Sequence, residues 1–114
     1  MVDFKITKTK LLREQNNDMC HNYYYLIQGR LYNEEKTKYR RFRFVEWFDI
    51  FDVMEFCDKD YVTKEEIKDF ALEVAISQIE TIKDFNDEKS IKDFYHYAYE
   101  SVENWNKMAC YWNW

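Results

Sequence analysis

The sequence predicts an α+β domain in two layers, with a three-stranded antiparallel meander followed by two long antiparallel helices in the order β-β-β-α-α. Three observations lead to this fold class. Runs rich in β-branched and aromatic residues fill the chain to about residue 47, a helix-capping signal appears at Thr63, and apolar residues then recur at helical spacing. A chain of 114 residues can bury one hydrophobic core, so residues 1–114 are expected to form a single domain.

The first half of the chain contains the strand signals. Three strands are expected, in residues 3–13, 22–32 and 38–47. Polar clusters at residues 14–18 and 33–36 form short turns between them, and short connections make a meander the natural arrangement. Gly29 inside the second strand predicts a β-bulge or a close approach of two backbones.

The second half of the chain contains the helix signals. Residues 63–66, Thr-Lys-Glu-Glu, form a capping box, and the apolar residues behind it predict a helix over residues 64–84. A second helix is expected to be capped by Asn86 or Asp87 and to run to about residue 111. Because few residues connect the two helices, they should lie antiparallel.

The charges divide unevenly along the chain. Residues 1–43 contain ten Lys and Arg against five Asp and Glu, whereas residues 44–114 contain seven against seventeen, for a net charge of −5. Such asymmetry favours a partner chosen by electrostatics, although helices that carry acids on solvated faces would produce the same pattern.

No catalytic or cofactor motif is present, so we expect a protein that is not an enzyme and needs no cofactor. The single glycine cannot form a phosphate-binding loop, and the cysteines and histidines lack the paired spacing of a zinc site: Cys20, His21, Cys57, His96 and Cys110. Scattered, unpaired cysteines fit reduced thiols in the cytoplasm. The sequence shows neither a signal peptide nor an apolar run that could span a membrane.

The stretch after the third strand is acidic and aromatic, and its periodicity fits a short helix or an irregular turn to about residue 57. Acids recur there at about every third position, and the candidate partner-binding set is Glu46, Asp49, Asp52, Glu55, Asp58 and Asp60. The candidate aromatic anchors are Trp47, Phe48, Trp112 and Trp114. Such a surface can imitate nucleic-acid phosphates and occupy a basic groove. The alternative is a solvated helix face between buried aromatics.

A second hypothesis is direct nucleic-acid binding by a basic, aromatic sheet. Alternation along the third strand places Phe42 and Phe44 on one face and Arg41, Arg43 and Val45 on the other. The residues that could provide stacking surfaces and phosphate contacts are Tyr23, Tyr25, Arg40, Arg41 and Arg43. A third hypothesis is an interaction subunit, with a homodimer sealed by the aromatic C-terminal helix.

In size, single-domain build, acidic balance and aromatic richness, the whole chain resembles the small inhibitors that phages and mobile elements use against host defence, anti-CRISPR proteins among them. Its Lys/Asn/Tyr/Phe/Ile-rich composition resembles that of low-GC bacteria and their phages. The resemblance carries over no residue roles, because these inhibitors share no common fold. It implies an inhibitor in the bacterial cytoplasm whose partner is a protein with a basic nucleic-acid-binding surface, such as a CRISPR effector.

Overall fold

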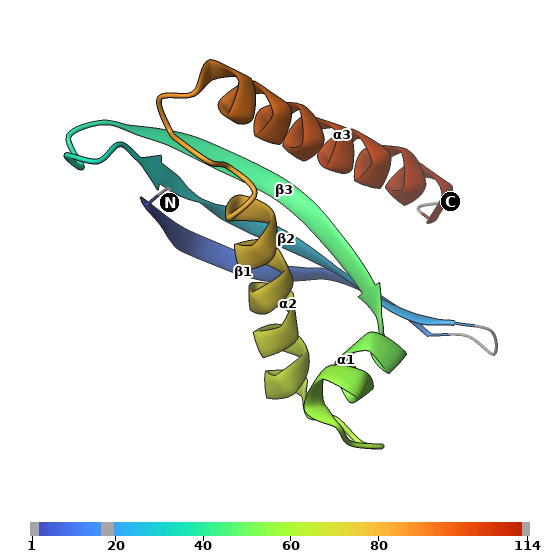
Figure 1. The fold of residues 1–114 in the computed structure, drawn as a ribbon. Coiled ribbons are helices and arrows are strands. Elements are labelled where there is room, and N and C mark those ends of the chain that lie inside the picture. The colour runs from blue at the N-terminus through green and yellow to red at the C-terminus, as the bar shows by residue number, and fades with distance from the viewer. Residues whose placement is uncertain (1–2, 17–19, 113–114) are drawn as a thin grey trace.

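The computed structural model describes residues 3–16 and 20–112, and within them it confirms the α+β class and the three-stranded meander (Figure 1). The elements in chain order are β1 (Asp3–Asn16), β2 (His21–Tyr32), β3 (Tyr39–Asp49), α1 (Ile50–Cys57), α2 (Lys64–Ile79) and α3 (Glu88–Trp112). The described residues thus contain three helices rather than two, because the ambiguous stretch after β3 forms the short helix α1.

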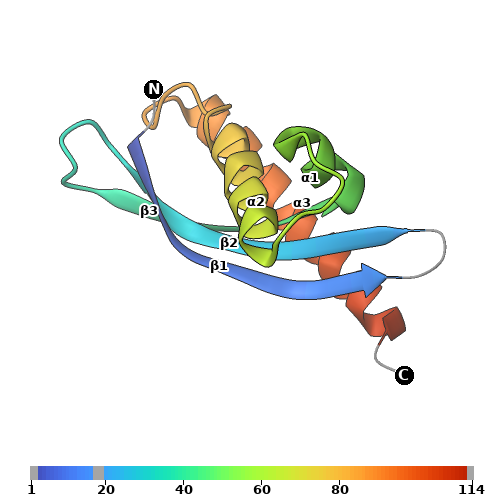
Figure 2. The same cartoon turned by 90° about the horizontal axis from the view of Figure 1, so that it is seen from below.

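The sheet has the order β1-β2-β3 with both pairs antiparallel, and its two faces differ in how the helices cover them. Helices α1 and α2 lie together over one face, which we call the helix side (Figure 2). The sheet residues that point to this side and form the core are Tyr23, Tyr25, Ile27, Leu31, Phe42, Phe44 and Phe48. The opposite face, which we call the open face, is left uncovered by α1 and α2.

Helix α2 packs on the helix side through small residues. Its buried stripe is Ile67, Ala71, Ala75 and Ile79, at the spacing expected for one helical face. The methyl side chains of Ala71 and Ala75 are fully buried, so the helix axis can come close to the aromatic rings of the sheet. The ring of Phe70 reaches Phe48 edge to face, with ring centroids 4.8 Å apart.

Helix α3 starts on the helix side, where Phe94 packs edge to face on Phe42 and Phe44 with centroids 5.8 Å away. It then crosses the outer edge of β3, and its C-terminal part reaches the level of the open face (Figure 2). There the ring of Trp105 lies 5.4 Å from that of Tyr24, which belongs to the open face. One helix therefore contacts both faces of the sheet.

The crossing satisfies backbone groups of β3 that β2 cannot reach. The Tyr95 hydroxyl donates a hydrogen bond to the Arg41 carbonyl oxygen at 2.6 Å, and the Val45 amide donates to the Ser101 hydroxyl oxygen at 3.0 Å. Uncovered strand edges invite pairing with other chains, so α3 protects this edge.

The helix boundaries refine the sequence predictions. The capping box at Thr63 and Glu66 is confirmed, but α2 ends at Ile79 instead of continuing to residue 84. The chain turns there, and the Ile82 amide donates a hydrogen bond to the Ile79 carbonyl oxygen. This turn places Ile82 in the core and directs the chain toward α3 at the β3 edge. Of the two proposed caps for α3, Asp87 has this role, since its carboxylate accepts from the Lys89 amide.

Gly29 is needed because two groups occupy the space where a side chain would be. A Cβ at this position would collide with the Lys5 carbonyl oxygen and would lie 2.5 Å from the Phe42 ring. The register between β1 and β2 also shifts between Ile6 and Lys8, next to Gly29, which confirms the predicted irregularity.

We predict that Gly29→Ala lowers the free energy of unfolding by about 1–3 kcal/mol, because the ring or the strand must move to admit the methyl group. Urea unfolding measures the change. Gln28→Ala is the matched control, since its side chain points to the open face. A Gly29→Ala variant as stable as the control would show that the sheet relaxes freely at this point.

Candidate nucleic-acid interface

The open face carries a dense set of cations that the strand register places together. Lys5, Arg30 and Arg41 are direct cross-strand partners and form a row across all three strands. Lys8, Gln28 and Arg43 form the next row, and Lys10 follows on β1. We call this set the cationic face; it consists of Lys5, Lys8, Lys10, Arg30, Arg41 and Arg43.

Like charges placed directly opposite one another destabilise a sheet. Within residues 3–16 and 20–112, none of these six cations forms an ion pair with a carboxylate. Arg30 has a different contact, with its guanidinium 4.9 Å from the centre of the Tyr39 ring. The row therefore presents concentrated positive charge to solvent, where a bound anion would relieve the repulsion.

Two acids of the described strands share the open face, Asp3 and Asp49, and each has a partner at its own end of the sheet. Asp3 forms an ion pair with Lys36 at 3.1 Å. Asp49 caps α1, because its carboxylate accepts a hydrogen bond from the Asp52 amide at 3.0 Å. Each lies at an end of the face, so the central rows meet no acid from the described strands.

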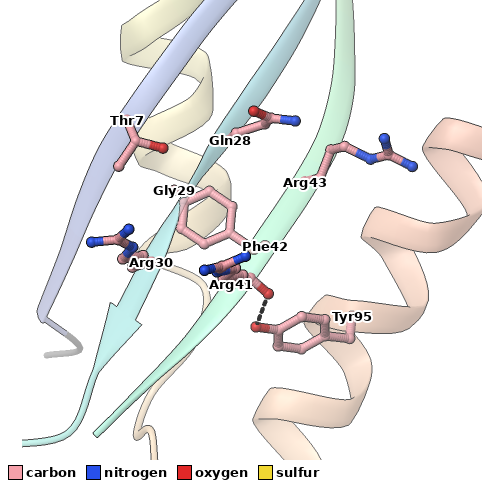
Figure 3. Close-up of a pocket in the computed structure, with 8 residues that line it drawn as sticks. All are labelled: Thr7, Gln28, Gly29, Arg30, Arg41, Phe42, Arg43 and Tyr95. Atoms are coloured by element: carbon pink, nitrogen blue, oxygen red, sulfur yellow. Dashed lines mark hydrogen bonds between the residues drawn. The ribbon is translucent and has the colours of Figure 1, made fainter.

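The centre of the cationic face is hollowed into a shallow cavity of about 520 Å³ (Figure 3). Arg30, Arg41 and Arg43 line it together with Gln28 and the hydroxyl-bearing Thr7 at the register shift. Figure 3 shows the Arg30 and Arg41 side chains side by side and Arg43 on the side nearer α3. Guanidinium groups, an amide and a hydroxyl together can donate several hydrogen bonds to phosphate oxygens.

Farther along the open face, the surface becomes aromatic. Trp47 is 60% exposed and its ring stacks beside the buried ring of Tyr24, at 6.3 Å between centroids. At the opposite end, Tyr39 is exposed beside Tyr32. The cationic rows are thus flanked on both sides by rings that face the same way.

The residues proposed from the sequence for direct nucleic-acid binding divide between the two faces. Arg41 and Arg43 lie on the cationic face, as alternation predicted. The placement of Tyr23 and Tyr25 on a binding surface is corrected, because both side chains point to the helix side and are buried in the core. Arg40 is exposed but pairs with Leu31 on the helix side, so it is removed from this surface.

The acidic set is also divided. Asp52, Glu55, Asp58 and Asp60 remain exposed on and after α1, and Asp49 is the α1 cap. The placement of Glu46 and Phe48 on a partner-binding surface is corrected, because even-numbered positions of β3 point to the helix side. Glu46 is 8% exposed, and Phe48 is in the core. Trp47 is exposed on the open face, away from α1. The Trp112 side chain and Trp114 lie outside the described residues.

Sequence reasoning missed Lys5, Lys8, Lys10 and Arg30. The three lysines are on β1 and Arg30 is on β2, and only the register brings them next to Arg41 and Arg43 of β3. The available signal was the alternation of Lys5 with Phe4 and Ile6, which marks the lysine as facing away from the core.

Other kinds of site receive no support from the described part of the chain. No cluster of three His, Cys, Asp or Glu residues there could hold a metal ion. No helix in it is both long and apolar enough to cross a lipid bilayer. Cys20 and Cys57 are half-buried, and Cys110 is exposed on α3.

Comparison of the chain with protein-family models, curated proteins and solved structures gives no match.

Among the described residues, Glu46 is the one buried acid, and it lies between β3 and α3. The Tyr97 hydroxyl donates a hydrogen bond to its carboxylate, and burial raises the pKa of Glu46 from 4.5 to about 7. Between these two values the folded protein binds more protons than the unfolded chain. This carboxyl group therefore costs no stability below about pH 4.5, and its cost grows as the pH rises to about 7.

We predict that Glu46→Gln is more stable than the parent by about 2 kcal/mol near pH 8 and equally stable near pH 4.5, because the amide keeps an acceptor for Tyr97 without a charge. Urea unfolding across this range measures the difference, with Glu55→Gln on exposed α1 as the control. An unchanged gap between variant and parent at both ends would show that Glu46 is not the titrating group.

Proposed function

We propose that the protein is a nucleic-acid-binding module that holds a phosphate backbone on its cationic face. The single observation that carries this proposal is the row Lys5–Arg30–Arg41, a line of directly opposed cations with no acid of the described residues paired to it. Such a row costs stability when empty and gains favourable contacts when phosphates lie along it.

The distribution of acids supports the same orientation. Helices α1, α2 and α3 all carry exposed acids, whereas the central rows of the open face contain none. A polyanion is therefore repelled from the helices and attracted to the sheet, which steers it to one face despite the net charge of −5.

The shape of the face favours an unpaired strand over a duplex. The surface is a three-stranded sheet with an exposed ring at each end, Tyr39 and Trp47, and α3 reaches its level only along the β3 edge (Figure 2). Single-strand binders combine a basic track with rings on which bases stack.

We predict that Arg30→Ala with Arg41→Ala weakens binding to a short single strand and reduces the slope of log K against log salt by about 1.4, since two phosphate contacts are lost. Fluorescence anisotropy at several salt concentrations measures both effects. The matched control is Lys68→Ala with Lys92→Ala, which removes two exposed cations from the helices.

The same double variant should be as stable as the parent or slightly more stable, because it removes a like-charged pair. A variant that unfolds would instead assign the arginines a structural role. Unchanged salt dependence in a folded variant would contradict nucleic-acid binding on this face.

A second candidate is the inhibitor that the resemblance implies, and one observation favours it. Phe51 on α1 is 69% exposed, and Phe56 and Tyr61 are exposed nearby. Four exposed acids surround them, Asp52, Glu55, Asp58 and Asp60, and the cation in this region, Lys59, is paired with Glu66. Exposed aromatics within an acidic surface fit docking into a basic groove, such as that of a CRISPR effector.

For this candidate we predict that Asp52→Lys with Glu55→Lys removes inhibition of a CRISPR nuclease in a DNA-cleavage assay, because the reversed charges repel the groove. Asp49 is left intact, since changing it would remove the α1 cap. The control is Asp93→Lys with Glu100→Lys, which reverses two exposed acids on α3. Inhibition that survives the α1 reversal would rule out this surface.

A further inference from the structure

A second cavity, of about 490 Å³, lies between β3 and the C-terminal half of α3, beyond the cationic rows. Aromatic rings form part of its wall, from Tyr24, Trp47 and Trp105. Glu46 at the β3 edge and Asn104 and Lys107 on α3 supply its polar groups. Its mixture of rings and a few polar groups differs from the hollow among the arginines, which is mainly polar.

Tyr24 contacts both indoles of this cleft. Its ring centroid is 6.3 Å from that of Trp47, in a stacked pair, and 5.4 Å from that of Trp105, in a pair tilted by 42°. The planes of Tyr24 and Trp47 are inclined by 25°. Since Tyr24 is buried while Trp47 is 60% exposed, the indole of Trp47 offers a supported ring face to solvent.

The cleft continues the cationic face rather than forming a separate surface. Trp47 is on β3, two positions of the same face beyond Arg43, with Val45 between them. At about 3.3 Å per residue, the four-residue step places the indole roughly 13 Å along the strand from Arg43. A nucleic acid whose phosphates contact Arg41 and Arg43 can therefore extend toward the cleft.

We infer that this cleft takes one unpaired nucleobase, stacked on Trp47, from a strand whose backbone lies along the cationic face. This inference rests on the proposed function and deepens it, because it makes the ligand a single strand with exposed bases. Stacking tolerates every base, since each has a π-face. The Asn104 amide can donate a hydrogen bond to a base edge and accept one from it. Lys107 adds a cation for a neighbouring phosphate.

The test compares a ten-nucleotide oligothymidylate, roughly the site size of one small binding domain, with an abasic strand of equal length. Anisotropy at about 50 mM salt gives both affinities. We expect the parent protein to bind the thymidylate about tenfold more tightly than the abasic strand. In Trp47→Ala this preference should disappear while abasic binding is unchanged. Trp47→Phe should restore part of it, and Phe51→Ala, which removes a comparably exposed ring from α1, should leave it intact.

The outcomes separate the two proposals. Equal binding of both strands by the parent would overturn the stacking site and leave the cationic face standing. A preference that persists in Trp47→Ala would also overturn the stacking site. A Trp47→Ala variant that loses abasic binding would mean that the indole only supports the fold. If neither strand binds even at low salt, the proposed function and the inference both fail.

Discussion

The passage of α3 across the outer edge of β3 is the constraint on which the rest of the structure depends. Tyr95 and Ser101 bind backbone groups of that edge, and Phe94 and Trp105 pack on opposite sides of it. Because α3 is used to close the edge, it cannot lie flat on either face. The helix side is then filled by α1 and α2, and the open face stays exposed over most of its area.

That exposure explains why the charges matter more than the overall balance suggests. An acidic protein is expected to repel nucleic acid, but the net charge does not show how positive one particular face of the molecule is. Here β1 contributes three cations to the cationic face, β2 one and β3 two, and the strand register brings them into rows. The excess of acids is on the helices, and α1 and α2 hold theirs on the other side of the sheet (Figure 2), so the protein has two surfaces of opposite sign.

The aromatic residues divide in a similar way. The rings buried in the core pack between the sheet and the helices; they are Tyr23, Tyr25, Phe42, Phe44 and Phe48. Trp47 and Phe51 remain at the surface on opposite sides of the sheet. Each lies beside one of the charged surfaces, which is the combination of ring and charge that dominates binding energy at interfaces.

Local patterns in the sequence were sufficient for the fold class, the three strands, the capping box at Thr63 and the facing of Arg41 and Arg43. These features depend on alternation, helical spacing and capping, which involve residues close in the chain. The sequence did not reveal that Glu46 and Phe48 are buried, because a regular series of acids looks the same on a strand end and on an exposed helix. The end of α2 at Ile79 was likewise set by where α3 has to begin.

The cationic face itself was decided by tertiary structure alone. Lys5, Arg30 and Arg41 are far apart in the chain, and a shift of register by one residue would send any of them to the core side. The register is held by the apolar residues of the helix side and by the irregularity beside Gly29. The sequence by itself determined which elements form and how charged each one is, because those properties are local. Which charges meet, and which face remains uncovered, followed only from how the elements pack.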